Sequence, residues 1–346
     1  MPNPVLTSAI DRLAAREDLT TDQMAAVLAE IMGGNASEVE TAAVLIALRT
    51  KGETVDELVG LATTMRRFAS PVTLSSLTRD DLIDTAGTGG GRQTFNVSTT
   101  AALIAAGAGC TVAKHGNRSA TGLSGSADVL EALGVRIDLD PAAVARCIEE
   151  VGFGFMFAPA HHGATRFVIP VRKELAVRTI FNFLGPLTNP AGATRQVIGV
   201  SDPAFLEVIA GALARLGAKK ALVVSSADGL DELSTAGVTR VVEVGGGALR
   251  SYEVTPEDVG LGRCVYEDVA GGPPDANAET TRRIFAGVNG PARDLAVLNA
   301  GAAIYAAGRA DGLESGVRAA EAAVDSGAAA RALDRLVELT AKLAPS

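Results

Sequence analysis

The stretch from Leu82 to Leu133 constrains the fold more than any other part of the chain. It reads LIDTAGTGGGRQTFNVSTTAALIAAGAGCTVAKHGNRSATGLSGSADVLEAL, in which short apolar runs alternate with glycine-rich polar loops. This alternation is typical of strand, loop and helix following one another in a parallel α/β sheet. The predicted elements are a buried strand at 82–83, a loop over 87–91, a helix start at 96–99, a second strand at 111–113 and a second loop from 114.

The first loop has the composition of an anion-binding site. Its glycines, at 87, 89, 90 and 91, let the backbone approach a ligand closely, and the following helix presents free N–H groups at its positive end. The loop has neither the Walker lysine nor the GxGxxG period, so it is not a P-loop or a dinucleotide fingerprint. For one isolated glycine run, a tight turn that binds nothing is the alternative.

The second loop supplies the basic groups, because it is expected to carry Lys114, His115, Asn117 and Arg118. Loops after neighbouring parallel strands meet at one edge of a sheet, so the two loops predict a shared pocket. Lys114 and Arg118 are either solvated charges or anion contacts, and their glycine-flanked place favours the contacts. His115 is an acid/base group, a substrate contact or a loop former, and a substrate contact is favoured.

Two adjacent carboxylates, Asp231 and Glu232, follow a predicted strand at 221–225. Carboxylate oxygens suit Mg²⁺, which keeps waters and substrate phosphates as its other ligands. A solvated acidic turn is the alternative. His161 and His162 have no Cys or carboxylate at metal-ligand spacing, so zinc is not expected.

Length and charge narrow the class of protein. A chain of 346 residues is longer than a single core usually supports, which predicts two units. A net charge of −9 argues against a nucleic-acid partner, although a local basic site for a small phosphorylated ligand remains compatible with it. Three widely spaced cysteines favour a reducing cytoplasm. The sequence contains no apolar run of eighteen residues, so no membrane span is predicted.

Residues 1–72 are predicted to form a small helical domain, and residues 73–346 a larger α/β domain with a mostly parallel sheet flanked by helices. Three capping boxes mark helix starts in the first part: Thr20 with Gln23, Ser37 with Glu40, and Thr54 with Glu57. The apolar faces of these helices are expected mostly to build their own core.

The rest of the chain continues the α/β pattern. Its predicted elements are helices at 142–151 and 203–216, strands at 153–157, 196–200 and 221–225, a hairpin over 238–254 and Ala-rich helices from 276 onward. One helix is expected to carry both Arg172 and Arg178 and to stop at Gly185 and Pro186.

The motifs GTGG, NVST, KHGNR and SGSADVLEALG, in this order, resemble those of the anthranilate phosphoribosyltransferases over nearly the whole chain. The resemblance implies transfer of the phosphoribosyl group of phosphoribosyl pyrophosphate to anthranilate in tryptophan biosynthesis, with Mg²⁺. It also implies a homodimer formed through the helical domain, and a segment of about 170–192 that returns to that domain and closes over the pocket.

By the same resemblance, each group of motif residues has an implied ligand. The implied phosphoribosyl pyrophosphate ligands are Gly87, Thr88, Gly89, Gly90, Thr94, Asn96, Ser98, Thr99, Lys114 and Ser124. The implied anthranilate contacts are Gly87, His115, Asn117, His162 and Arg172, with Arg172 on the carboxylate and Asn117 near the amine. The implied metal ligands are Ser98, Asp231 and Glu232. No covalent nucleophile is expected, because no Ser/His/Asp or Cys/His constellation is present.

The sequence departs from the family pattern in both loops. Gly91 follows GTGG where the family commonly has Asp-Gly, which shortens the loop by one residue and removes an acid near the pyrophosphate and metal. Thr121 and Gly122 replace a serine pair after KHGNR. The rival readings are a pyrimidine-nucleoside phosphorylase, transfer to a related aromatic acid, and a nucleic-acid-binding protein on a transferase fold.

Overall fold

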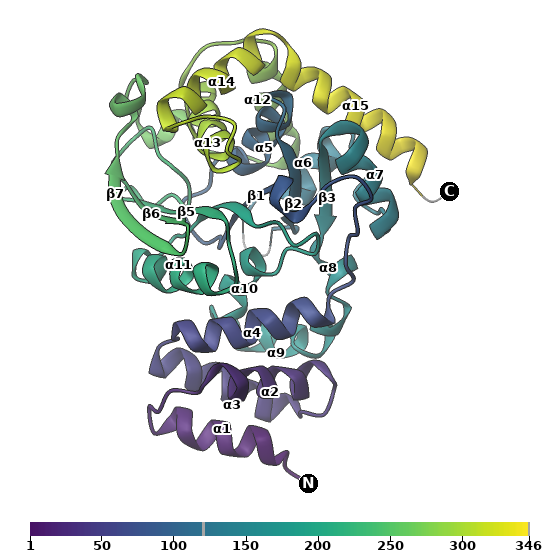
Figure 1. The fold of residues 1–346 in the computed structure, drawn as a ribbon, viewed down its shortest axis with the longest axis vertical. Coiled ribbons are helices and arrows are strands. Elements are labelled where there is room, and N and C mark those ends of the chain that lie inside the picture. The colour runs from purple at the N-terminus through teal and green to yellow at the C-terminus, as the bar shows by residue number, and fades with distance from the viewer. Residues whose placement is uncertain (120–121, 345–346) are drawn as a thin grey trace.

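The computed structural model describes residues 1–119 and 122–344, and these form a helical part stacked beneath a larger α/β part (Figure 1). The N-terminus lies at the far end of the helical part, and the C-terminus lies beside the α/β part. Within the described residues, no helix is both long and apolar enough to cross a membrane.

The helical part begins with four helices. They are α1 (Pro4–Ala14), α2 (Thr21–Met32), α3 (Glu38–Lys51) and α4 (Val55–Phe68). All three predicted capping boxes are confirmed: the hydroxyls of Thr20, Ser37 and Thr54 accept from the third residue of α2, α3 and α4, whose side chains bond back. Each box satisfies N–H groups that the first turn of a helix leaves free, which fixes where the helix begins.

The α/β part is built on one sheet of seven strands in the order β3-β2-β1-β4-β5-β6-β7. The strands are β1 (Leu82–Gly87), β2 (Thr111–Gly116), β3 (Phe153–Phe157), β4 (Arg195–Gly199), β5 (Lys220–Ser226), β6 (Thr239–Gly245) and β7 (Ala248–Val254). The first five are parallel, and β6 and β7 add the predicted antiparallel hairpin. Because β1 lies between β2 and β4, the loops that follow these three strands meet at one edge.

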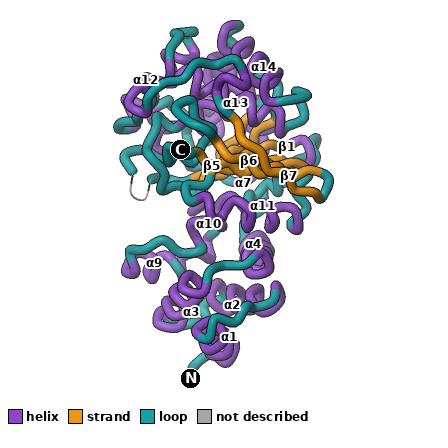
Figure 2. Tube along the Cα trace, turned by 90° about the vertical axis from the view of Figure 1, so that its left-hand side faces the viewer, coloured by secondary structure: helices purple, strands orange, loops and turns teal. Residues whose placement is uncertain are grey.

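Helices cover both faces of the sheet (Figure 2). Those of the α/β part are α5 (Val97–Gly107), α6 (Ser126–Ala132), α7 (Pro141–Val151), α8 (Ala158–His161), α11 (Leu206–Arg215), α12 (Pro274–Phe285), α13 (Pro291–Ala306), α14 (Leu313–Asp325) and α15 (Ala328–Leu343). The Ala-rich helices α12 to α15 gather with α5 over one face, as predicted, while α11 lies on the other, between the sheet and α4. The expected fold class is confirmed.

The buried core corrects the expectation that the helical part has a core of its own. One apolar cluster lies between the sheet and α5, α7 and α12 to α15. The other runs without a break from Leu6 in α1 through α4 and α11 to Val223 and Val242 on the sheet. Four short helices do not bury all their apolar faces against one another, so α4 packs on α11 and the two parts share this lower core.

The segment that returns to the helical part forms α9 (Ile169–Leu175) and α10 (Phe181–Leu187). Val168 and Ile180 join the lower core, and α9 contacts α3. The single long helix predicted here is wrong, because Ala176 adopts a left-handed φ of 52° and ends α9. Arg178 therefore lies in the non-helical connection, and Pro186 lies inside α10, where it removes one backbone hydrogen bond.

Candidate active site

The glycine-rich loop begins where β1 ends and is held by the loops after β4 and β5. Thr88 N donates to the carbonyl of Gly199 at 2.8 Å, and Gly89 N donates to Asp231 Oδ2 at 3.0 Å. Gly89 and Gly90 have φ of 65° and 83°, a left-handed conformation in which glycine is the residue without steric cost. These bonds and the left-handed glycines fix the conformation of the turn.

Asp231 fills the space beneath this loop. A Cβ atom at Gly87 or at Gly91 would lie 2.8 Å from one of its carboxylate oxygens, and a Cβ at Gly199 would overlap its carbonyl oxygen. Burial raises the pKa of Asp231, and burial together with the charge of Asp231 raises the pKa of Glu232. Two carboxylates whose negative charge is disfavoured in this way are stabilised by a bound cation.

Lys114 is the buried cation of the site, with 1% of its surface exposed. It lies in β2 and not in the following loop as predicted, because β2 continues to Gly116. Its Nζ donates to the carbonyl of Thr85 and lies 3.4 Å from Ser98 Oγ in the first turn of α5. Burial lowers the pKa of Lys114, against the opposing charges of Asp84 and Glu232.

Asp84 is a buried carboxylate at this edge of the sheet that the sequence reasoning did not single out. Its carboxylate is fully buried in β1 and accepts from His115 N at 3.1 Å and from Asn189 Nδ2 at 2.8 Å. Burial raises its pKa to about 6. The signal was available, since a lone Asp within the apolar run of a central strand requires buried partners.

Asn96 joins the two predicted loops. It has a left-handed φ of 65° and does not cap α5 with its side chain. Its Nδ2 donates instead to the carbonyl of Ser124 at 2.9 Å, and its Oδ1 accepts from Ser124 Oγ at 2.9 Å. Asn277 Nδ2, which the sequence reasoning did not single out, also donates to Asn96 Oδ1 at 2.8 Å. The Asn96 side chain therefore does not bind the N–H groups in the first turn of α5, where Ser98 and Thr99 lie.

Two buried histidines lie beside this edge, with ring centroids 5.0 Å apart: His115 in β2 and His162 after α8. Burial is the main cause that lowers the pKa of His115 to about 3 and that of His162 to about 4, so both rings are neutral at physiological pH. His115 Nδ1 lies 3.1 Å from the carbonyl of Gly185. Because a carbonyl only accepts, Nδ1 carries the proton and Nε2 presents a lone pair, which has no partner within the described residues.

The second loop differs from the expectation at Arg118. Its guanidinium forms ion pairs with Asp128 at 2.9 Å and with Glu131 at 2.5 Å, so its charge is neutralised by α6 and it is not a free anion contact. Asn117 is exposed and its Oδ1 accepts from Arg118 N. Thr121, where the sequence departs from the family motif, lies outside the described residues.

Arg172 lies in α9, and its guanidinium carbon is 5.6 Å from the ring centre of Phe181. Burial lowers its pKa. Within the described residues its side chain has neither a hydrogen bond nor an ion pair, which leaves the fork of N–H donors available to a carboxylate.

Thr94 lies on the far side of the loop, where its backbone pairs with Ala270 in an isolated antiparallel bridge. Tyr266 packs against the same place: its hydroxyl donates to the carbonyl of Gln93 at 2.8 Å, and its ring lies 4.0 Å from the guanidinium carbon of Arg92. Behind Phe95 is a separate cavity of about 230 Å³, bordered by α12 and the start of α13. The segment after β7 therefore contacts the chain that follows the glycine-rich loop, at Gln93 and Thr94.

Comparison with known proteins agrees with this geometry. Residues 79–330 match the glycosyl transferase family a/b domain, and residues 7–69 match the helical bundle domain of that family. The anthranilate phosphoribosyltransferase of Rubrobacter xylanophilus is 52% identical over 98% of this chain and 99% of its own length. That of Moorella thermoacetica is 50% identical over 96% and 98%. The chain belongs to the anthranilate phosphoribosyltransferase family.

Solved structures of the family share the whole fold. The enzyme of Thermus thermophilus has a TM-score of 0.90 at 46% identity, covering 96% of this chain and 99% of its own. The enzyme of Saccharomyces cerevisiae in complex with phosphoribosyl pyrophosphate and magnesium has a TM-score of 0.88 at 26% identity, covering 98% of both chains. The resemblance seen in the GTGG, NVST and KHGNR motifs is confirmed.

The phosphoribosyltransferase fold brings most of the predicted residues together at the carboxyl edge of β1, β2, β4 and β5. One group comprises Gly87 to Gly90, Asn96, Ser98, Lys114, Ser124, Asp231 and Glu232. His115 and His162 form a second group, and Arg172 comes from the returning segment. Thr94 contacts Ala270 through its backbone, and Asn117 is exposed.

Proposed function

We propose that the chain transfers the phosphoribosyl group of phosphoribosyl pyrophosphate to the amine of anthranilate, the reaction named by its family, which belongs to tryptophan biosynthesis. One observation carries this proposal: β2 places Lys114 and His115 next to each other, and successive strand residues point to opposite faces of a sheet. Lys114 reaches Ser98 at the start of α5, while His115 reaches Gly185 in α10. Two substrates would thus approach the same edge from two sides.

On the donor side, the glycine-rich loop would hold the pyrophosphate. Its N–H groups, the first turn of α5 with Ser98 and Thr99, and Lys114 all favour an anion. Thr88 and Thr94 flank the loop, and Ser124 reaches it through Asn96. Gly89 N donates to the carboxylate of Asp231, so an oxygen acceptor already lies against this loop.

On the acceptor side, the neutral ring of His115 would accept a hydrogen bond from the amine of anthranilate at Nε2. A pKa of about 3 makes this nitrogen a weak base, so it orients the amine lone pair and does not hold a proton. Arg172 would bind the carboxylate of anthranilate, with His162 and Asn117 as the other contacts. Arg172 belongs to the segment of about 170–192, so one acceptor contact would come from the returning segment, while the donor contacts would come from the loops at the edge of the sheet.

The donor set fits Mg²⁺. Asp231 and Glu232 would provide carboxylate oxygens, whose charged form burial disfavours and a bound cation would favour, and Ser98 Oγ lies 3.4 Å from Lys114 Nζ. The described residues contain no cluster of three His, Cys, Asp or Glu side chains, so these carboxylates would share the ion with substrate phosphates. When bound, Mg²⁺ neutralises negative charge on the departing pyrophosphate.

Catalysis would come from positioning and charge. The loop and Lys114 stabilise the pyrophosphate as it leaves the anomeric carbon, while the sugar becomes cationic. His115 and Arg172 fix the amine of anthranilate in line with that carbon, which converts an encounter between two substrates into a reaction within one complex. No protein nucleophile is required: the amine nitrogen would form its bond to the anomeric carbon as the bond to the pyrophosphate oxygen breaks, and the proton that the nitrogen loses would pass to the departing pyrophosphate or to water.

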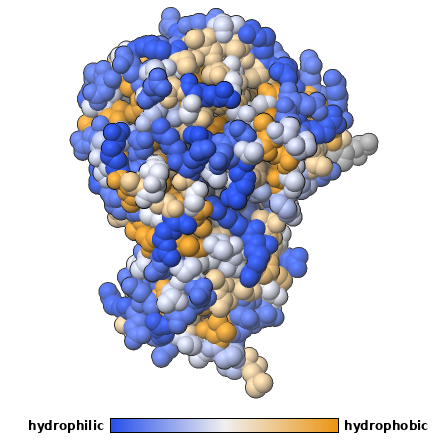
Figure 3. Space-filling model, in the orientation of Figure 1, coloured by the Kyte–Doolittle hydropathy of each residue, from blue (hydrophilic) through white to orange (hydrophobic). Residues whose placement is uncertain are grey.

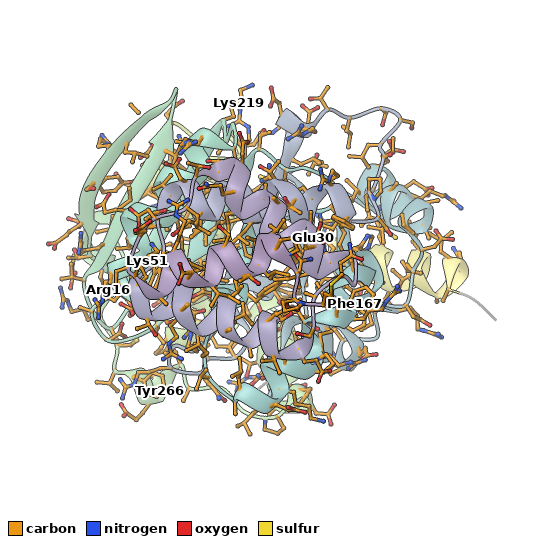
Figure 4. The ribbon with its side chains drawn as sticks, turned by 90° about the horizontal axis from the view of Figure 1, so that it is seen from below. Arg16, Glu30, Lys51, Phe167, Lys219 and Tyr266 are labelled. Carbon is orange, nitrogen blue, oxygen red and sulfur yellow. The ribbon has the colours of Figure 1, made fainter. Side chains whose placement is uncertain are left out.

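The chain would act as a homodimer through its helical part. Exposed large apolar side chains gather on α1, α3 and the returning segment: Val5, Val39, Ile46, Phe167, Ile169 and Val177. Figure 3 shows apolar surface among the hydrophilic residues of this part, and Figure 4 views it from below with Phe167 labelled. Free thiols at Cys110, Cys147 and Cys264 support the proposal of a reducing, cytoplasmic location.

The decisive assay follows the loss of anthranilate fluorescence on mixing the protein with anthranilate, phosphoribosyl pyrophosphate and Mg²⁺. Loss that requires all three components supports the proposal. No loss with folded protein overturns it, and phosphate-dependent release of base from uridine or thymidine would then identify a nucleoside phosphorylase. Competition by ring-substituted benzoates tests whether a related aromatic acid is the better acceptor.

The metal assignment has its own test in Asp231→Asn and Glu232→Gln. Both variants should lose at least about a hundredfold in turnover at limiting Mg²⁺, because each removes a charge-assisted metal contact. Binding of pyrophosphate, followed by calorimetry with and without Mg²⁺, should lose its dependence on the ion. Glu257→Gln, which removes an exposed carboxylate paired with Arg263, is the control. Full turnover of the Asp231 and Glu232 variants at limiting Mg²⁺ would contradict the assignment.

A further inference from the structure

We propose that Arg178 is a further ligand of the pyrophosphate group, delivered to the glycine-rich loop by the segment that returns to the helical part. The proposal rests on the proposed function and adds a cation that the sequence motifs do not contain. It assigns to the returning segment a contact with the donor through Arg178, in addition to the contact with the acceptor through Arg172.

The guanidinium of Arg178 lies directly against the loop. Its Nη1 donates to Ser201 Oγ at 2.9 Å, and its Nη2 lies 3.5 Å from the carbonyl of Thr88. A Cβ atom at Gly90 would overlap Nη1, so the absence of a side chain at Gly90 is what admits the guanidinium. Ser201 in turn donates to the carbonyl of Gly89 at 2.9 Å. Arg178 therefore occupies the wall of the loop itself.

The charge of Arg178 is not neutralised by an ion pair. Of the carboxylates in the described residues, none lies within ion-pair distance of it, in contrast to Arg118, which binds Asp128 and Glu131. The electrostatic partner that it does have is Asp231, whose pKa it lowers against the larger effect of burial. The loop from Gly87 to Gly91 contains no Asp or Glu, so no carboxylate of the loop itself neutralises this cation.

Arg178 also has more N–H donors than it uses in hydrogen bonds to the protein. A guanidinium has five N–H groups in a planar fork that suits phosphate oxygens, and the contacts above use two of them. A residue that served only to tie the loop to the returning segment would need no charge. A partly buried, unpaired guanidinium beside a glycine-rich loop is arranged for an anionic ligand.

Arg49 provides the link to the helical part. From the last turn of α3, its Nη1 donates to the carbonyl of Arg178 at 2.8 Å. The backbone of Arg178 is thereby held by the helical part while its side chain reaches the loop. Arg49 is a positioning residue in this arrangement, and movement of α3 relative to the sheet would move the cation relative to the pyrophosphate.

The test compares Arg178→Gln and Arg178→Lys with Lys173→Gln, which removes an exposed charge from the same segment. Calorimetric titration with pyrophosphate and Mg²⁺, without acceptor, measures the contact directly. Loss of one charge-assisted contact predicts binding weakened about tenfold to a hundredfold in Arg178→Gln, partly restored in Arg178→Lys and unchanged in Lys173→Gln. The KM for phosphoribosyl pyrophosphate should rise by a similar factor, while that for anthranilate stays within about twofold.

Two outcomes overturn the proposal. One is pyrophosphate binding by Arg178→Gln equal to that of the unaltered chain, at an equal midpoint of thermal unfolding. The other is a loss in Arg178→Gln that Arg178→Lys does not restore at all while both variants lower the midpoint of thermal unfolding, because that pattern belongs to a residue that only ties the loop to the returning segment. The binding arm does not depend on anthranilate, so failure of the transferase assay with pyrophosphate binding intact is a failure of the proposed acceptor and not of Arg178.

Discussion

Lowering the pH should destabilise the protein through His115 and His162. Their pKa values in the folded chain are about 3 and about 4, against an ordinary value of 6.5. The unfolded chain therefore binds protons between pH 6.5 and these values while the folded chain does not, so this part of the stability is complete above pH 6.5 and is lost as pH falls. The two side chains are 6% and 2% exposed, so solvent screens the effect little.

The size of the effect follows from one pKa unit being worth about 1.4 kcal/mol. A pH of about 5 is roughly 1.5 units below the ordinary histidine pKa. Each buried ring should therefore lower the free energy of unfolding by about 2 kcal/mol, and the two together by about 4 kcal/mol. Urea unfolding at about pH 7.5 and pH 5 measures this loss. The variants His115→Leu and His162→Leu remove one titrating ring each, so each should reduce the difference between the two pH values by about 2 kcal/mol.

Carboxylates also contribute to acid unfolding, and they contribute equally to the unaltered chain and to the histidine variants. The comparison of pH differences therefore isolates the rings. A pH difference that is the same in the variants as in the unaltered chain would refute the reasoning, because it would mean that the buried rings take up protons in the folded state as readily as in water.

Two further predictions concern the helical part. Gly60→Ala should lower the free energy of unfolding in urea by about 1–3 kcal/mol, because its Cβ would overlap Thr21 O and force α2 from α4. Gly163→Ala is the control, because a Cβ at this position meets open space. Equal urea midpoints for Gly60→Ala and the unaltered chain would show that the two helices yield freely. Glu57→Gln should cost about 3–5 kcal/mol, because the buried carboxylate accepts from Leu19 N at 3.0 Å and pairs with Lys51 at 3.0 Å. Glu40→Gln, in the exposed box of α3, should cost much less, and a loss as large as that of Glu57→Gln would contradict the role given to burial.

The sequence predicted those features that depend on local chemistry. Capping boxes, glycine-rich turns and strand-loop-helix alternation are encoded within a few residues, so the helix starts at Thr20, Ser37 and Thr54 and the meeting of the two loops were predictable. The ion pairs of Arg118 were not, because the turn before α6 decides whether Asp128 and Glu131 reach it.

The remaining differences arise from tertiary contacts. Periodicity shows that a helix face is apolar and does not show what covers it, so the continuous core from α1 to the sheet was missed. The helical pattern through Arg172 and Arg178 was interrupted by a left-handed Ala176, which propensity alone does not predict. Asp84 was overlooked because its partners, His115 and Asn189, are far away in sequence.

The shared lower core also governs the order in which the chain becomes foldable during synthesis. Helices α1 to α4 end at Phe68, but their apolar partners in the same core begin at Val168, 100 residues later. At ribosomal rates of about 5–20 residues per second, the first four helices wait roughly 5–20 s before the surface that covers them has been made. A transcript cut near residue 72 thus encodes helices with an uncovered apolar side.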